Sequence, residues 1–524
     1  MKNLVLFFQI FFHCAFLAAQ PSIQWQKALG GSDNDESTCI LQTSDGGYVV
    51  TGYTLSNNED VLGNHGLFDI WVVKLTETGL IQWKKTLGGN DYDWAYSVCQ
   101  TNDGGYLVVG YTQSNNGDVS GNHGDKDAWV VKLGSTGAIQ WKKSLGGSGW
   151  EEAWSVQQTF DGGYIMAGRA NSNDGDVSGN HAGSLDFWVV KLSDIGSVEW
   201  QKSLGGSDED TATSIKQTSD GGYIVVGEAK STDGDVVGNN GNVDFWVVKL
   251  NNLGEIEWQN ALGGNGWDFA GDIHETSDGY IACGSVGSHN TGDVTGHQGL
   301  FDFWIVKLSK NGVLLWQKAL GGSKGDWGRS ILQTSDGMYV VTGTTQSSDG
   351  DVLINNAIET AWILKLNDAG EILWQKSLGG TVGEGSNCIK QTSDSGYIIA
   401  GYAWSNDGDV SGNHGGGDFW VVKLSPESVS TSVPQISPLK ISPNPAQQSI
   451  SLKNPSLSAV VSTEAGEETT LTIRITNLLG RQLSRQTIAN DGKVNIEALP
   501  NGLYLLTATT SSGSVYTGKF IKQE

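Results

Sequence analysis

The chain has 524 residues, of which 73 are glycine, 20 tryptophan and only 8 proline, and its formal net charge is −25. Hydrophobic residues make up 38% and charged residues 17%, which excludes a disordered polyelectrolyte and a long coiled coil. The excess of 57 acidic over 32 basic residues repels phosphate backbones and argues against a nucleic-acid partner. Abundant glycine and tryptophan favour β-strands joined by tight turns.

The first residues have the layout of a secretory signal peptide. Lys2 precedes an apolar run over residues 4–17, and Ala18, Ala19 and Gln20 form a small-residue cleavage region. The run is shorter than the ~20 apolar residues that span a bilayer, and no later segment is long enough. We therefore expect residues 1–20 to be a signal peptide and the mature chain to have no transmembrane segment.

The strongest pattern is an internal repeat. A tryptophan that closes an Ile-x-Trp-like strand recurs every 58 or 59 residues, at Trp25, Trp83, Trp141, Trp200, Trp258, Trp316 and Trp374. A second tryptophan, in strands resembling Trp-Val-Val-Lys-Leu, keeps the same rhythm at Trp71, Trp129, Trp188, Trp246, Trp304, Trp362 and Trp420. Each repeat has four strand-like segments, and a Thr-x-Asp-Gly-Gly-Tyr turn joins the first two as a hairpin. Seven such units predict an all-β, seven-bladed β-propeller over residues 22–425.

The phase of the repeat predicts how the ring closes. The chain opens with a lone fourth strand, Ile23 to Leu29, and the last repeat ends after its third strand, Trp420 to Leu424, where Ser425-Pro426 follows. The amino-terminal strand can therefore complete the last blade and satisfy hydrogen bonds that a linear solenoid would leave open. We expect these two strands to pair.

The cysteines form neither a zinc cluster nor a dense disulfide framework. Cys14 lies in the signal peptide, which leaves Cys39, Cys99, Cys283 and Cys388 in the mature chain. Cys39 and Cys388 occupy the same position in their repeats. We expect them to be small buried apolar groups rather than the two ends of a bridge.

The repeats end at a linker, residues 426–436, and a separate module follows over residues 437–524. This module carries 8 basic and 6 acidic residues, a net charge of +2, and its alternating segments suggest a small β-sandwich. Four motifs occur in order: Ile441-Ser442-Pro443-Asn444-Pro445, Asn477-Leu478-Leu479-Gly480-Arg481, Leu499-Pro500-Asn501-Gly502-Leu503-Tyr504 and Lys519-Phe520-Ile521-Lys522. Together they resemble the type A C-terminal sorting domain of the type IX secretion system.

The resemblance implies a partner and a cellular location. A type IX sorting domain is recognised by the secretion machinery of a Bacteroidetes-type bacterium and is removed after export. We therefore expect residues 437–524 to contact that machinery, and the protein to be secreted or attached to the outer cell surface.

Tryptophans outside the repeat positions mark a candidate ligand-binding face. Five of them lie in the loops that follow the Gly-Gly step, at irregular offsets: Trp94, Trp150, Trp154, Trp267 and Trp327. Acidic residues accompany them at Asp93, Glu151, Asp268 and Asp326. Exposed aromatic rings stack on sugars or peptides while carboxylates accept hydrogen bonds. The alternative is that these rings fill crevices between blades.

The loop between the second and third strands is similar to a calcium loop. The candidate ligands are Asn116, Asp118, Ser120 and Asp127 in the second repeat, Asp233, Asp235 and Asp244 in the fourth, and Asp407, Asp409, Ser411 and Asp418 in the seventh. Calcium favours six to eight oxygen ligands, which such spacing can supply. The final acid is Asp rather than Glu, however, and the sixth repeat has Ile354 and Thr360 in place of Gly and Asp. The alternative is that the final Asp caps the third strand through local backbone hydrogen bonds.

We expect a non-enzymatic binding or adhesion module for glycan or protein ligands, with calcium as its only candidate cofactor. Two alternatives remain: a carbohydrate-active hydrolase on a propeller scaffold, and a structural component of a surface layer. No catalytic residue is assigned, because the loops contain many carboxylates and no pair stands out. Sialidase chemistry is disfavoured, since that family uses three arginines and the propeller has only Arg169 and Arg329.

Overall fold

The structure is a computed structural model that describes residues 20–181, 183–355, 357–427, 437–438, 440–453, 471–476, 482–488, 493–510 and 515–523. The apolar run of the expected signal peptide and the motif at residues 477–481 lie outside these residues. The chain divides into two compact units, one of which is Gln20–Ser428. Each unit is described by itself.

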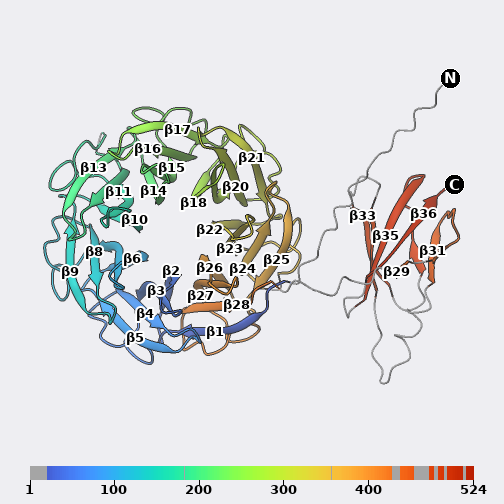
Figure 1. Ribbon diagram of the computed structural model, residues 1–524, viewed down its shortest axis with the longest axis horizontal. Helices are drawn as coiled ribbons and strands as arrows, with labels where there is room; N and C mark the ends of the chain where they lie inside the picture. Colours follow the sequence, from blue (N-terminus) through green and yellow to red (C-terminus); the bar gives the residue numbers. More distant parts are fainter. Residues whose placement is uncertain are drawn as a thin grey trace. The chain divides into compact units, whose positions relative to one another are not determined.

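Seven antiparallel sheets of four strands form a ring (Figure 1). Blades 1 to 3 contain β2 (Asp35–Gln42), β3 (Tyr48–Thr54), β4 (Asp69–Leu75), β5 (Ile81–Leu87), β6 (Asp93–Gln100), β7 (Tyr106–Thr112), β8 (Asp127–Leu133), β9 (Ile139–Leu145), β10 (Glu151–Gln158), β11 (Tyr164–Ala170), β12 (Asp186–Leu192) and β13 (Val198–Leu204). Blades 4 and 5 contain β14 (Asp210–Gln217), β15 (Tyr223–Ala229), β16 (Asp244–Leu250), β17 (Ile256–Leu262), β18 (Asp268–Thr276), β19 (Gly279–Val286), β20 (Asp302–Ser309) and β21 (Leu314–Leu320). Blade 6 contains β22 (Asp326–Gln333), β23 (Tyr339–Thr345), β24 (Thr360–Leu366) and β25 (Ile372–Leu378). The expected seven-bladed propeller is confirmed.

Blade 7 combines both ends of the ring. Its strands are β26 (Glu384–Gln391), β27 (Tyr397–Ala403), β28 (Asp418–Leu424) and, as the fourth, β1 (Ile23–Leu29). β1 pairs antiparallel with β28, with Trp25 opposite Lys423 and Leu29 opposite Phe419. The Ser425 amide donates to the Ser22 carbonyl at 2.8 Å. The predicted closure by the amino-terminal strand is therefore confirmed.

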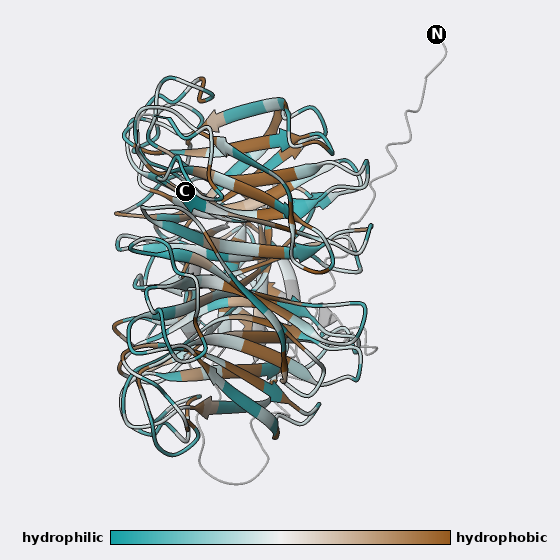
Figure 2. Cartoon of the chain, turned by 90° about the vertical axis from the view of Figure 1, so that its left-hand side faces the viewer, coloured by the Kyte–Doolittle hydropathy of each residue, from teal (hydrophilic) through white to brown (hydrophobic). Residues whose placement is uncertain are grey.

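The core lies between neighbouring blades. The third-strand tryptophans are almost completely buried, and they contact rings of the preceding blade, as Trp246 contacts Phe187 at 4.6 Å between ring centroids. The fourth-strand tryptophans cover the next hairpin: a Cβ on Gly79, which has a φ of 78°, would lie 3.0 Å from the Trp25 ring. In Figure 2 the brown segments lie mainly along the strands, some of which also carry teal segments, and the loops at their ends are largely teal.

The Thr-x-Asp-Gly turns gather on one side of the ring, which we call the turn face. In blade 2 the Asp103 carboxylate accepts the Gly105 amide at 3.0 Å, as expected for the hairpin. It also pairs at 2.9 Å with Lys132, a buried lysine of the Trp-Val-Val-Lys-Leu strand. The hydrogen bond from Thr101 and the Lys132 ammonium lower the pKa of Asp103 to about 2. The repeated lysine is thus the buried partner of the repeated turn aspartate.

The carboxy-terminal unit is a two-sheet sandwich. One sheet has the order β29 (Ser437–Pro438), β36 (Val515–Lys522), β35 (Gly502–Thr510), β32 (Leu471–Thr476) and β33 (Gln482–Ile488); the other is β30 (Lys440–Ser442), β31 (Ser449–Lys453) and β34 (Lys493–Asn495). Ile450 and Val494 of the smaller sheet share one buried cluster with Ile473, Leu506 and Phe520 of the larger sheet. This confirms the expected small sandwich.

Candidate functional site

The loop face is the side of the ring where the first strand of each blade begins and the second strand ends. There the second residue of each first strand lies opposite the residue that follows the glycine of the second strand: Trp94 opposite Tyr111 in blade 2, and Glu152 opposite Arg169 in blade 3. The strand residues around these pairs repeat from blade to blade, whereas the pairs themselves differ. This variation gives the face its chemistry.

Blades 1 to 3 carry a cluster of six rings that we call the aromatic platform: Tyr53, Trp94, Tyr96, Tyr111, Trp150 and Trp154. Trp94 lies against Tyr53 with 3.4 Å between ring centroids, and Tyr96 stacks on Trp154 at 4.8 Å. The Lys126 ammonium lies 4.2 Å from the Tyr111 ring centre and 4.1 Å from that of Trp150. The three tryptophans are partly exposed, so the platform presents ring surface to solvent.

Glu152 holds one end of the platform in place. Its carboxylate accepts the indole N–H of Trp150 at 2.8 Å and of Trp154 at 2.9 Å, and it pairs with Lys126 and Arg169 at 3.0 and 2.9 Å. Burial opposes its ionisation, yet the Arg169 and Lys126 charges and the two indoles hold the pKa of Glu152 below its ordinary value. The buried carboxylate therefore fixes the orientation of two tryptophans and two cations.

Trp267 and Trp327 belong to a separate row of rings in blades 5 and 6. Phe269 and Phe301 connect them, with centroid distances of 5.9 Å from Trp267 to Phe269, 5.7 Å between the phenylalanines and 6.2 Å from Phe301 to Trp327. Trp267 is 48% exposed. The five tryptophans predicted from sequence thus form two groups on one face rather than a single site.

A pocket on the same face combines acidic and aromatic groups. The cavity measures about 480 Å³, and its lining includes Glu36, Arg329, Glu359, Tyr402 and Trp404. The Tyr402 hydroxyl donates to Glu359, and Trp404 is 44% exposed. Burial raises the pKa of Glu36, and the negative charge of Glu359 adds to that rise. We call this site the acidic pocket.

The axis of the ring holds the central cavity, of about 510 Å³, which residues of all seven first strands line. Its walls include Cys39, Asp272, Arg329 and Cys388. On the face above, Glu228 takes in blade 4 the position that Arg169 has in blade 3. Burial raises the pKa of Glu228 to about 7, although Arg329 and Arg169 oppose the shift.

The carboxylates predicted to bind ligand with the tryptophans lie beneath the surface of the loop face. Asp93, Glu151, Asp268 and Asp326 are fully buried, so they do not line the exposed face. Asp93 accepts the Gly89 amide at 2.7 Å and the hydroxyls of Thr112 and Ser114. Because all seven repeats place an acid here, these residues anchor the loop above each blade. The presence of an acid at this position in every repeat of the sequence indicates a residue that the fold requires.

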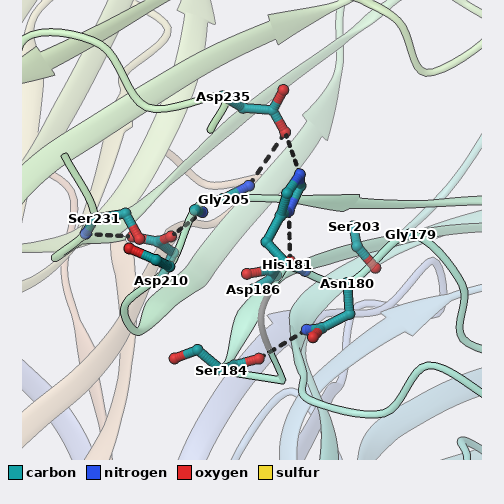
Figure 3. A network of polar contacts seen from close by, with 12 residues as sticks. Gly179, Asn180, His181, Ser184, Asp186, Ser203, Gly205, Asp210, Ser231 and Asp235 are labelled. Carbon is teal, nitrogen blue, oxygen red and sulfur yellow. Dashed lines mark hydrogen bonds and ion pairs between the residues drawn. The ribbon is translucent and has the colours of Figure 1, made fainter. Parts of the chain in front are cut away.

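Neighbouring blades meet at clusters of acidic residues, one of which Figure 3 shows. Asp186 accepts the His181 amide at 2.8 Å through Oδ2, while its Oδ1 has no hydrogen-bond partner among the described residues. A Cβ on Gly205 would lie 2.6 Å from an oxygen of Asp210 and 2.7 Å from Asp186 Oδ1, so only glycine fits between them. Burial raises the pKa of Asp186 to about 6, and the Asp210 charge adds to the shift.

The side chains of the calcium-like loop are divided between two blade junctions. In the fourth repeat, Asp233 accepts the Ser207 amide and Asp235 that of Gly205, whereas Asp244 lies beside Gly263 at the next junction. In the seventh repeat, Asp407 and Asp409 accept the Thr381 and Gly379 amides, and Asp418 lies beside Gly30. In the second repeat, Asn116 accepts the Asn90 amide and Asp127 that of His123. Within the described residues, no group of three or more His, Cys, Asp or Glu side chains is placed to hold a metal ion.

Sequence reasoning missed most polar residues of the loop face. Tyr53, Tyr111, Arg169, Glu228 and Tyr402 all follow the glycine of the second strand in their repeats. The neighbouring residues in this strand are mostly Val, Ile, Thr or Ala, but this one position differs in charge and size between blades. A position that varies inside an otherwise repeated strand could have identified these residues from the sequence.

The two units differ in the known proteins that they resemble. No curated protein sequence matches the chain. Among solved structures, Sqt1 from Chaetomium thermophilum is 11% identical, covering 77% of this chain and all of its own, with a TM-score of 0.40. A Synechocystis apocarotenoid oxygenase mutant is 11% identical, covers 79% of this chain and 95% of its own, and has a TM-score of 0.37. A puromycin hydrolase is 9% identical, covers 74% of this chain and 53% of its own, and has a TM-score of 0.39. These likenesses carry no activity to this chain.

Residues 440–523 match the family of secretion system C-terminal sorting domains. The match spans the described strands β30 to β36 and contains the Pro-Asn-Pro and Lys-Phe-Ile-Lys motifs. Among the described residues, no helix is long and apolar enough to cross a membrane. The carboxy-terminal unit is therefore a type IX sorting domain, and the chain is an exported propeller protein, secreted or displayed on the outer surface of a Bacteroidetes-type bacterium.

Proposed function

We propose that the propeller is a non-enzymatic binding module and that its loop face binds a glycan outside the cell. The observation that supports this most directly is the aromatic platform, where partly exposed rings lie beside fixed cations. Sugar rings stack on such surfaces through their C–H groups, and their hydroxyls accept from or donate to polar groups at the edge. Export by the type IX system brings this face into contact with extracellular glycans.

The acidic pocket extends the proposed binding face. Trp404 offers a second exposed ring, and Arg329, Asn387 and Glu359 offer donors and acceptors around a cavity of about 480 Å³. Small polar ligands bind in cavities of this size when a few polar groups fix their orientation. We propose that one sugar residue of the glycan enters this pocket while neighbouring residues lie on the face.

The experiment is a glycan array on the exported protein, followed by titration of the best glycan. Trp94→Ala removes the ring that contacts Tyr53 and should weaken binding about tenfold. Phe160→Ala is the matched control, because Phe160 is 74% exposed but lies in a hairpin turn on the turn face. Equal affinity of both variants would contradict the proposal, and so would an array with no bound glycan.

A carbohydrate-active hydrolase remains the second candidate, supported by one observation. Glu36 and Glu359 line the same pocket, and burial raises the pKa of Glu36, which is how a general acid is kept protonated. Incubation of the bound glycan with the protein tests this candidate by product release. Turnover that Glu36→Gln abolishes while binding survives would establish a hydrolase in place of a binding module.

A further inference from the structure

The central cavity brings together two cysteines that are 349 residues apart in sequence. Cys39 is on β2 of blade 1, Cys388 is on β26 of blade 7, and their sulfur atoms are 4.0 Å apart. Figure 1 shows β2 and β26 side by side at the centre of the ring. Both residues are free thiols in the structure, and both line the central cavity.

The two cysteines belong to a ring of equivalent positions, one on each first strand. The other five members are Ser97, Ser155, Ser214, Asp272 and Ser330. Adjacent members contact each other, as Ser214 contacts Asp272 at 2.7 Å. Cysteine thus occupies the two positions that face each other between the first and the last blade.

We propose that Cys39 and Cys388 form a disulfide in the exported protein and lock the ring covalently. The step is thiol–disulfide exchange with a small organic disulfide outside the cytoplasm. One thiolate attacks the oxidant, which forms a mixed disulfide and releases the first thiol; the second thiolate then attacks the protein sulfur of that mixed disulfide and releases the second thiol. The two cysteines lose two protons and two electrons, and the oxidant leaves as two thiols.

The geometry and the local charges favour this reaction. The sulfurs must approach by about 2 Å to reach bonding distance, which side-chain rotation supplies when Cβ atoms are close. The contact with the Cys388 thiol lowers the pKa of Cys39, and the charge of Lys390 contributes, which favours Cys39 as the attacking thiolate. Compartments beyond the inner membrane also favour persistent disulfides.

The bond would change what holds the propeller closed. In the reduced chain, the ring depends on hydrogen bonds between β1 and β28 within blade 7. A link from Cys39 to Cys388 encloses the first strands of all seven blades in one covalent loop. If β1 then separated from β28, the blades would remain in order, and the unfolded chain would lose conformational freedom.

Peptide mass spectrometry without reductant tests the proposal directly. The exported protein is treated with oxidised glutathione, unfolded with free thiols blocked, and digested with trypsin. Cleavage after Lys27, Lys74, Lys376 and Lys390 gives peptides 28–74 and 377–390, each with one cysteine of the pair. We expect one linked species, two hydrogen masses lighter than the sum, which reductant converts to the two peptides. Separate blocked peptides, or glutathione attached to only one, would overturn the proposal.

Thermal unfolding with and without reductant provides a second readout. Reductant should lower the Tm of the oxidised protein by roughly 5 °C or more and should not change that of Cys39→Ser. Cys99→Ser is the matched control, because Cys99 is a free cysteine of the neighbouring first strand, and it should retain the reductant effect. A reductant effect of equal size in Cys39→Ser would contradict a covalent lock.

Discussion

The two faces of the propeller are built from the same strands, yet they differ in how strictly they repeat. On the turn face, every blade pairs a turn aspartate with a buried lysine, from Asp45 and Lys74 to Asp394 and Lys423. On the loop face, a repeated buried acid lies beneath residues that change from blade to blade. Repetition therefore marks positions required by the fold, while irregularity inside the repeat marks candidate ligand contacts.

The largest expected effect is the loss of a buried anchor on the loop face. Asp93→Ala leaves the Gly89 amide and the Thr112 and Ser114 hydroxyls without their acceptor. We expect the free energy of unfolding to fall by about 3 kcal/mol, measured by urea denaturation. Asp93→Glu is the matched control, since Glu151 and Glu384 occupy this position in other blades. Equal losses in both variants would show that the contacts of the carboxylate do not govern the site.

The next effect is a pH dependence that originates at the blade junctions. Burial raises the pKa of Asp302 to about 7, and the charges of Asp326 and Asp351 add to that rise. A carboxyl whose folded pKa exceeds its unfolded value near 4 stabilises the fold at low pH and loses this contribution as pH rises. Stability should therefore fall between pH 4 and pH 7. Asp302→Asn should reduce that fall by about 2 kcal/mol.

The junction between blades 6 and 7 supplies the reverse experiment. Thr360 stands there in place of the junction aspartate, so Thr360→Asp should add pH dependence that the native junction lacks. On the turn face, the pKa values of Asp103, Asp161 and Asp220 are lowered to about 2, so stability should also fall below pH 4. Denaturation midpoints measured from pH 2 to pH 8 should show a maximum near pH 4. A profile that rises from pH 4 to pH 7 would contradict this reading of the junctions.

The smallest expected effect concerns the turn face. Lys249 is buried, pairs with Asp220 at 3.1 Å and donates to the Leu250 carbonyl at 3.0 Å. Lys249→Met keeps most of the apolar chain but removes these contacts, and it should cost about 1 kcal/mol because Asp220 is well exposed. Lys310→Met, in an exposed turn, is the control and should cost less. No difference between the two would mean that the repeated lysine acts only through packing.

The architecture could be predicted from the sequence because its causes are periodic. The tryptophan series set the number of blades, and the displaced strand Ile23 to Leu29 indicated the closure. The loop face was harder to predict, since its polar residues come from different blades and only the fold brings them together. Asp93 and its equivalents adjoin tryptophans in sequence, but the fold buries their side chains beneath the loops. The contact between Cys39 and Cys388 depends on ring closure, which relates the first and last blades.

The hydrogen bond between Ser22 and Ser425 makes the propeller nearly a circular chain with one break. Every blade connects to the next in the same way. The position of this break therefore depends on where the coding sequence starts and not on the structure of the ring. A permuted chain that joins residue 425 to residue 22 through a short linker and begins at Ile81 would place the break in blade 1, with β5 in the role that β1 has now. The loop face would keep all its residues in such a chain.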